Sequence, residues 1–279
     1  MRKMAGLFAV VISLTLIAPC FAYSLPPVTD GLVGCWKFDE GSLVTAIDTS
    51  GSGNDGMMVN TTYSEPPPES LSTSSLKFNN TNSGNAYSYI TIPDSSSLRP
   101  SSGLTLAAWV KTDTNEGRLR VIISKQYGSS NHDSFVLWCH DDGRLWFSLE
   151  GVGVIQAGQP PLNEWHHIVA TYNGSFMRLY MDGVEQSSGA ATGSILYDNN
   201  TVLIGADSNQ ADHTPDEGWS GFIDEVLIYN RALNQTEIAQ IMIPEFPSVL
   251  TLSLFMSATI VGVIVYTRRH RKQANLSFS

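Results

Sequence analysis

The 279-residue sequence predicts an all-β protein, a two-sheet antiparallel jelly-roll sandwich held between two apolar ends. Three observations predict it. Residues 28–241 contain short runs of alternating apolar and polar residues, separated by Gly, Asn, Asp and Ser clusters, which is typical of half-buried strands joined by turns. Before residue 249 no run of helical periodicity exceeds ten residues. A region of about 210 residues with ten or more such strands suits one sandwich domain.

Ten segments carry this strand pattern. They are residues 32–38, 89–92, 104–111, 121–124, 134–139, 144–149, 166–172, 176–181, 201–204 and 222–229. Asp141–Gly143 and Asp182–Gly183 are typical hairpin turns, and they join the segments on either side of them. After the last strand, Asn234 and Glu237 form a capping-box pattern that predicts a short helix ending at Ile241.

The first 22 residues predict a secretory signal peptide. Arg2 and Lys3 precede an apolar run over residues 7–18, and small residues allow cleavage after Ala22. An uncleaved membrane anchor is the alternative. A signal peptide places the following domain outside the membrane.

The other end predicts a membrane anchor. Residues 249–266 form an uncharged apolar stretch of about 27 Å as a helix, enough to cross the hydrocarbon core. A basic cluster in residues 267–279 predicts a cytoplasmic C-terminus and an external N-terminus. Residues 242–248 contain Pro244-Glu245-Phe246, which resembles the PEF-type C-terminal sorting signals of archaeal surface proteins. The resemblance implies processing by an archaeosortase; a plain single-pass anchor is the alternative.

Charge is unevenly distributed along the chain. Of the 16 basic residues, two lie in the first segment and four follow the apolar stretch. The part between keeps 10 basic and all 26 acidic residues, a net charge of −16. Such a domain is no general nucleic-acid binder, because it has no excess of cations to neutralise phosphates. It favours cations such as Ca²⁺, although a solvated acidic surface explains most of these carboxylates.

Six stretches, taken in order, resemble the laminin G-like group of concanavalin A-like lectin/glucanase jelly rolls. They are residues 31–41, the glycine-rich loop 48–56, and residues 104–110, 165–172, 179–183 and 221–233. The resemblance implies a jelly-roll sandwich in which the first and last strands lie side by side. It departs at Cys35, where the family usually has an aromatic residue.

The resemblance also implies a structural calcium ion. Related folds bind Ca²⁺ beside the terminal strands, which suggests Asp39 and Asp224 as ligands. The loop 48–56 adds Asp48, Asn54 and Asp55, whose oxygen atoms suit calcium, which takes six to eight oxygen ligands. The alternative is that Asp48 and Asn54 only form the hydrogen bonds of Asx-turns.

The hairpin at Asp141–Gly143 predicts a ligand-binding face. If His140 lies opposite Arg144, then Trp138 lies opposite Trp146, because side chains alternate along paired strands. One face then carries the apolar residues Phe135, Leu137, Cys139, Leu145, Phe147 and Leu149 and is the core. The other carries Val136, Trp138, His140, Arg144 and Trp146, a candidate platform for sugar stacking. Coverage by another strand or loop is the alternative.

Catalytic motifs are missing from the sequence. Retaining glycosidases on this fold carry a Glu-x-Asp-x-x-Glu strand, whose alternation places acid and nucleophile on one face, and no such strand occurs. His166 and His167 cannot easily share a metal, because neighbours in a strand face opposite sides; we expect one in the core and one exposed. We therefore predict a non-enzymatic, surface-anchored module that binds carbohydrate or protein ligands. A glycoside-active enzyme with an unrecognised site and a structural envelope component are the alternatives.

The cysteines and sequons bear on two covalent modifications, a disulfide bond and N-linked glycans. Cys35 and Cys139 remain after the signal peptide; buried free thiols are favoured over a disulfide. Asn-x-Ser/Thr sequons occur at Asn60, Asn79, Asn173, Asn199, Asn234 and Asn275. Asn275 follows the membrane segment and Asn234 is used as a helix cap, so the other four are the better glycan acceptors.

Overall fold

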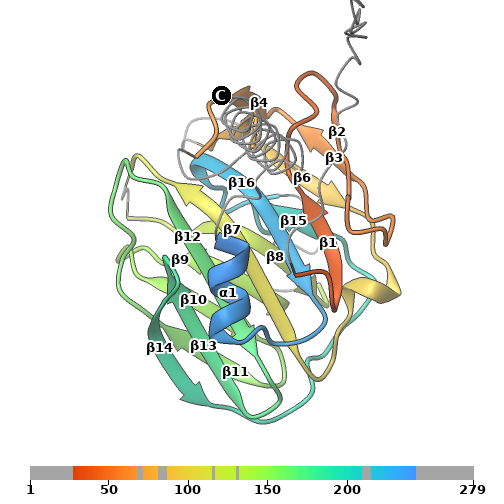
Figure 1. Cartoon of the computed structure of the whole chain (residues 1–279), viewed down its shortest axis with the longest axis vertical. Helices are drawn as coiled ribbons and strands as arrows, with labels where there is room; N and C mark the ends of the chain where they lie inside the picture. The colour runs from red at the N-terminus through yellow and green to blue at the C-terminus, as the bar shows by residue number, and fades with distance from the viewer. Residues whose placement is uncertain are drawn as a thin grey trace, which may run out of the picture.

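A computed structural model describes residues 28–67, 72–80, 87–114, 117–129, 132–208 and 215–242. These residues form two antiparallel sheets of eight strands each, packed face to face (Figure 1). The predicted all-β, two-sheet sandwich is confirmed.

Sheet A consists of eight strands. Along its main path they are β14 (Val184–Ala190), β13 (Phe176–Met181), β12 (His166–Tyr172), β7 (Leu104–Lys111), β16 (Ser220–Tyr229), β5 (Ser75–Asn79) and β4 (Thr62–Ser64). Off this path, β1 (Leu32–Trp36) pairs with β16. The first and last strands therefore lie side by side, as the family resemblance implied.

Sheet B also consists of eight strands. Their order is β11 (Gly153–Gln156), β10 (Leu145–Leu149), β9 (His132–Cys139), β8 (Arg120–Tyr127), β15 (Val202–Ile204), β6 (Tyr89–Ile92), β3 (Gly56–Val59) and β2 (Thr45–Ala46). A single 3₁₀ turn, η1 (Ser96–Leu98), follows β6.

The main hydrophobic core lies between the two sheets. Its largest fully buried apolar side chains include Trp36, Phe38, Phe78, Phe135 and Phe147. Alternation along each strand sends every second residue into this layer, so both sheets contribute apolar side chains. Burial of this apolar surface is the main force that holds the sheets together.

A second, smaller core lies on the outer face of sheet A. Helix α1 (Gln235–Met242) lies across this face in Figure 1 and buries Ile238 and Ile241 against it. Asn234 Oδ1 accepts the backbone N–H groups of Thr236 and Glu237 at 2.9 and 3.0 Å. Glu237 Oε2 in return accepts the N–H of Asn234 at 2.8 Å. The predicted capping box is therefore present, and it fixes where the helix begins.

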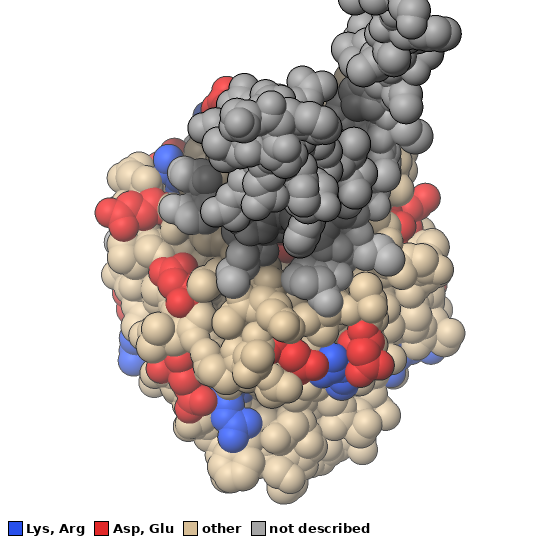
Figure 2. All heavy atoms as spheres, viewed as in Figure 1, with Lys and Arg blue, Asp and Glu red and all other residues tan. Residues whose placement is uncertain are grey.

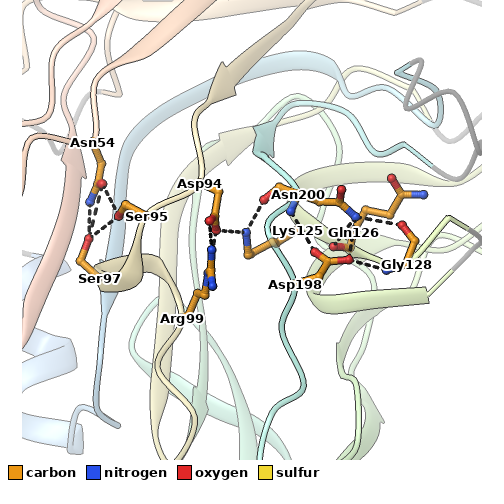
Figure 3. Close-up of polar contacts among 10 residues, drawn as sticks. All are labelled: Asn54, Asp94, Ser95, Ser97, Arg99, Lys125, Gln126, Gly128, Asp198 and Asn200. Atoms are coloured by element: carbon orange, nitrogen blue, oxygen red, sulfur yellow. Dashed lines mark hydrogen bonds and ion pairs between the residues drawn. The ribbon is translucent and has the colours of Figure 1, made fainter.

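A buried cation links three parts of sheet B. The Lys125 side chain is completely buried, and its Nζ donates to Asp94 Oδ1 at 2.7 Å and also to the carbonyl of Asn200 (Figure 3). Arg99 donates its Nε to the same Asp94 carboxylate at 2.9 Å. Burial lowers the pKa of Lys125, and the hydrogen bond from Arg99 lowers the pKa of Asp94. Asp94 thus compensates a charge that water cannot reach.

Cys35 and Cys139, the two cysteines among the described residues, are buried and unpaired. Cys35 belongs to the core under α1 and Cys139 to the core between the sheets. Burial raises the pKa of Cys35 to about 12 and that of Cys139 to about 11. Both thiols are therefore protonated and unreactive at neutral pH.

The predicted signal peptide, sorting motif, membrane helix and basic tail lie outside the described residues, except for Met242. Within the described part of the chain, no helix is long and apolar enough to cross a membrane.

Candidate functional site

The hairpin formed by β9 and β10 has the predicted register. Trp138 lies opposite Trp146, and Cys139 lies opposite Leu145. The turn is closed by two backbone hydrogen bonds of 2.8 Å, from His140 N–H to the Arg144 carbonyl and from Gly143 N–H to the His140 carbonyl. Gly143 has φ +82°, a conformation that suits glycine. The Asp-Asp-Gly turn thus fixes which side chains share a face.

The two faces of this hairpin differ as expected. The inward face is entirely core and consists of Phe135, Leu137, Cys139, Leu145, Phe147 and Leu149. On the outer face, Val136 is buried, Arg144 is exposed, and Trp138, His140 and Trp146 are half-buried. No described strand or loop covers the two indole rings completely, so part of each remains open to a ligand.

Three rings and a guanidinium form a row, which we call the aromatic strip: Trp138, Trp146, His140 and Arg144. The ring centres of Trp138 and Trp146 are 5.8 Å apart and tilted by 33°. His140 stacks on Trp146 at 5.0 Å, and the Arg144 guanidinium lies 6.0 Å from the Trp146 ring centre. Each contact is within the range of favourable aromatic or cation–π interactions, so the row is held in place by its own members.

Acidic residues of the turn hold the polar end of the strip. Arg144 Nε donates to Asp142 Oδ2 at 2.6 Å, and this hydrogen bond lowers the pKa of Asp142. His140 Nδ1 pairs with Asp141. His140, Asp141 and Asp142 have ligand atoms within 4.8 Å of one another. Their ion pairs with one another and with Arg144 account for the cluster.

The predicted metal residues fall into two groups. In the first, Asp48 and Asn54 are buried and work as hydrogen-bonding residues of the loop 48–56. The Asp48 carboxylate accepts the N–H groups of Cys35, Ser50 and Asn54 at 2.8–3.0 Å, and the Ser50 hydroxyl at 2.9 Å. Asp55 is exposed and accepts the N–H of Asp48 at 2.7 Å. These bonds match the Asx-turn alternative and occupy both oxygens of Asp48.

Asn54 connects the same loop to its surroundings. Its Nδ2 donates to the Val33 carbonyl at 2.7 Å and to the Ser97 hydroxyl at 2.9 Å. Its Oδ1 accepts the Ser95 hydroxyl at 2.7 Å (Figure 3). The side chain thus ties β1 to the turn η1.

Asp39 and Asp224 form the second group, beside the paired strands β1 and β16. Asp39 Oδ1 accepts the Ser72 hydroxyl at 2.8 Å and the Thr73 N–H at 2.6 Å. Asp224 has 0% of its surface exposed, and its Oδ1 accepts the Glu225 N–H at 2.9 Å. Burial raises the pKa of Asp224, and the negative charges of Glu225 and Asp39 raise it further. The two predicted residues therefore lie close enough for their charges to interact.

The backbone at Asp224 is bent. The pairing of β16 with β7 shifts register between Asp224 and Leu227, and Glu225 has φ +48°, a region that residues other than glycine seldom occupy. Such bulges re-aim side chains. Asp224 Oδ2 is buried and has no hydrogen-bond partner among the described residues. A buried unpaired carboxylate oxygen is costly, so this site needs a proton or a cation, and the residues present fit Ca²⁺.

The structure corrects the expectation for the histidine pair. His166 and His167 are both buried, although one was expected to be exposed. His166 Nδ1 lies 2.8 Å from Asp182 Oδ2, whereas the His167 ring packs 5.2 Å from Trp109 on the other face of β12. Burial lowers the pKa of His167 to about 4. The prediction failed because the outer face of sheet A is itself covered.

One acidic group was missed by the sequence analysis. Asp133 in β9 and Asp207 after β15 form a side-chain hydrogen bond, with the charges of Asp216 and Glu217 nearby. No motif connects these residues, because they come from separate segments and meet only in the folded sheet.

Comparison with known proteins supports the fold. A laminin G family model, described as the concanavalin A-like lectin/glucanases superfamily, matches residues 83–239, more than half of the chain. No curated protein matches the sequence.

Several solved structures share the fold. The binding domain of Paraclostridial mosquitocidal protein 1 superposes with a TM-score of 0.58 at 16% identity, over 77% of this chain and 52% of that one. The receptor-binding domain of botulinum neurotoxin C/D mosaic serotype superposes with a TM-score of 0.58 at 16% identity, over 77% of this chain and 51% of that one. A third structure is domain 4 of AbnA, an extracellular arabinanase from Geobacillus stearothermophilus, in complex with arabinotriose. It superposes with a TM-score of 0.56 at 18% identity, over 76% of this chain and 98% of that one. This chain thus spans about half the length of the toxin domains.

Proposed function

Because the chain belongs to the concanavalin A-like lectin/glucanase superfamily, we propose that it is a glycan-binding module that works outside the cell, with the aromatic strip as its ligand contact. The observation that carries the proposal is the pair of half-buried indole rings, Trp138 and Trp146, 5.8 Å apart on the outer face of sheet B. Contiguous exposed apolar surface commonly marks a binding site, and these two rings are neighbours on one face.

The chemistry of the strip suits a sugar. The C–H face of a pyranose or furanose ring stacks on an indole ring, and Trp138 and Trp146 together offer two such surfaces. His140 and Arg144 stand at the turn end of the row, and the N–H groups that Asp141 and Asp142 leave free could donate to sugar hydroxyls. One hairpin brings the four together, and their mutual contacts orient the strip before a ligand binds.

The structural neighbours support binding over catalysis. Two of them are toxin binding domains, and a third is an arabinanase domain in complex with arabinotriose. The superfamily also contains glucanases, so a hydrolytic role is the competing hypothesis. A protein ligand is the second alternative, because an aromatic surface binds peptides as well as sugars.

Two parts of the proposal concern stability and location. A calcium ion held by Asp39 and Asp224 would compensate the buried carboxylate and lock β1 to β16; its role is structural. The signal peptide and the segment 249–266 would place the domain on the external face of the membrane, with the C-terminus in the cytoplasm. Processing at Pro244–Phe246 by an archaeosortase would replace that segment with a lipid anchor.

The test is a glycan array probed with the full chain in detergent, with and without EDTA. Wild type should bind a defined set of glycans, and Trp138→Ala and Trp146→Ala should each weaken binding about tenfold or more. Trp165→Ala is the matched control, because Trp165 is also half-buried but packs on Phe222, away from the strip. Unchanged binding by both strip variants, with the fold intact, would reject the site.

A further inference from the structure

A second group of carboxyls lies over the outer face of sheet B. Asp133 belongs to β9, and Asp207 follows β15; their side chains share a hydrogen bond. The charges that act most strongly on Asp133 come from Asp207, Glu217 and Asp216, and all are negative. This group is separate from the aromatic strip and from the site of Asp39 and Asp224.

The register of the sheet explains why these residues meet. Phe135 faces the core and pairs with Lys125, so Ser134 points to the outer face. A bulge follows, and Asp133 pairs with Gln126, the next residue of β8. The bulge interrupts the alternation, which places Asp133 and Ser134 on the same outer face.

A segment of chain crosses this face and carries Asp207 there. The Ser124 hydroxyl, on the outer face of β8, donates to the Ala206 carbonyl at 3.1 Å. Asp207 and Asp216 exchange backbone hydrogen bonds of 2.9 and 2.7 Å. The stretch from Asp216 continues along β8, where Val121 N–H donates to the Glu217 carbonyl at 2.9 Å. These contacts bring Asp207 near Asp133, and the charges of Asp216 and Glu217 also act on Asp133.

Two buried oxygens in the bulge lack partners. Asp133 Oδ1 and Ser134 Oγ are both inaccessible to solvent and have no hydrogen-bond partner among the described residues. Ser134 has 0% of its surface exposed, so water does not compensate for the missing bond. An unpaired buried hydroxyl or carboxyl oxygen is costly, and here both occur on neighbouring residues that face the same acidic group.

We propose that this group is a second cation site, which takes Ca²⁺ through Asp133, Asp207 and the Ser134 hydroxyl. The donor set is entirely oxygen, which selects a hard cation over a transition metal. Asp216 and Glu217 add negative charge at its edge. A cation would satisfy both orphaned oxygens at once, whereas the hydrogen bond between Asp133 and Asp207 satisfies neither.

The protonation of the pair agrees with this geometry. Burial and the neighbouring Asp207 raise the pKa of Asp133 to about 9. The causes are the lack of water and the negative charges beside the group, and a bound cation would relieve both.

The position of the site links it to the strip. Trp138 pairs with Val121, and Val121 in turn bridges to Gly218, next to Glu217. An ion bound between β9 and the segment that carries Asp207 would thus fix the chain beside Trp138. Calcium at this second site would support the glycan-binding face, whereas calcium at Asp224 supports the joint of the terminal strands.

Calcium stoichiometry tests the proposal. The full chain in detergent, freed of metal, is titrated with Ca²⁺ in equilibrium dialysis. Wild type should bind two ions; Asp224→Asn and Asp133→Asn should each bind one, and the double variant none. Asp55→Asn is the control, because that exposed carboxylate belongs to neither site, and it should bind two. Equal stoichiometry in wild type and Asp133→Asn would overturn the second site.

Two further readouts keep the test decisive. If Asp133→Asn does not fold, the Asp224→Asn variant decides alone: one bound ion supports the second site and none overturns it. Glycan-array binding by Asp133→Asn separates this proposal from the function of the strip. If Asp133→Asn loses one calcium ion but still binds glycans, the second site is supported and its effect on the strip is rejected. Trp138→Ala should lose glycan binding and still bind two calcium ions.

Discussion

Trp138 and Trp146 lie directly opposite each other across the β9–β10 hairpin, with ring centres 5.8 Å apart. Their packing predicts an energetic coupling. In a double-mutant cycle with Trp138→Ala and Trp146→Ala, we expect the two losses in unfolding free energy to differ from additivity by about 0.5–1.5 kcal/mol. Urea denaturation of the four proteins measures it. If the two single losses in unfolding free energy add up to the loss of the double variant within about 0.2 kcal/mol, the rings do not stabilise each other.

Asp48 should act on stability independently of calcium. Asp48→Ala removes an acceptor of four hydrogen bonds and leaves buried N–H groups unpaired, so we expect a loss of about 3 kcal/mol or more. Thermal unfolding with and without EDTA provides the measurement. A loss that appears only when calcium is present would instead assign Asp48 to a metal site.

The effect of Asp224→Asn on the free energy of unfolding should change sign when calcium is added. Without calcium, the substitution removes a buried carboxyl whose pKa is raised, so it should stabilise the fold at pH 8 by about 1–2 kcal/mol. With calcium, the same change removes a ligand and should destabilise the fold. Chemical denaturation in both conditions tests this, with Asp55→Asn as a control that should respond alike in each. Destabilisation of equal size in both media would contradict the calcium proposal.

His167 should make the fold sensitive to acid. Its pKa is about 4 in the folded chain and near 6.5 in the unfolded chain, because burial disfavours the charged ring. The unfolded chain therefore takes up a proton first as pH falls, and stability is lost between pH 6.5 and 4. The loss from this group approaches about 3 kcal/mol.

His167→Gln should remove this part of the pH dependence. The comparison is the difference in unfolding free energy between wild type and variant, measured at several pH values from 7 to 4. His132→Gln is the control, because His132 is exposed beside Glu150. A constant difference across the range would show that His167 does not titrate differently in the two states.

The two cations on Asp94 should differ in importance. Lys125 is buried, whereas the Arg99 side chain is 37% exposed. Asp94→Ala leaves the Lys125 charge buried without its carboxylate and should cost about 3–5 kcal/mol, while Arg99→Ala should cost about 1 kcal/mol or less. Urea denaturation ranks the two variants. An Arg99→Ala effect as large as that of Asp94→Ala would show that Arg99 organises the network.

Much of the fold was predictable because alternation and turns are local signals. Strands β6, β7, β12 and β13 have the predicted bounds, and the capping box of α1 is present. No strand was predicted between residues 38 and 89, where β2 to β5 lie. Most of these are two to four residues long, which is too short for a period of two to be visible in the sequence.

The candidate site was predictable only where one turn determines the geometry. The register of Trp138 and Trp146 follows from the adjacent Asp141–Gly143 turn. Asp133 and Asp207 could not be paired in this way, because a bulge in β9 and the segment that follows β15 bring them together. The exposure of His166 and His167 was misjudged for a similar reason, since packing on the outer face is a tertiary property.

The acidic surface is less one-sided than the net charge implies. Figure 2 shows acidic side chains scattered over the face that carries α1, interspersed with basic ones. One carboxyl of each proposed cation site is instead buried: Asp224 within β16 and Asp207 after β15. A count of charges therefore could not locate them.

Helix α1 makes the two outer faces of the sandwich different. The helix seals the outer face of sheet A with Ile238 and Ile241, while the outer face of sheet B keeps its indole rings partly open. The proposed ligand contact, the aromatic strip, therefore lies on the side of the sandwich opposite α1. Binding through the strip alone would let glycans be cross-linked only by several copies arrayed on the same surface.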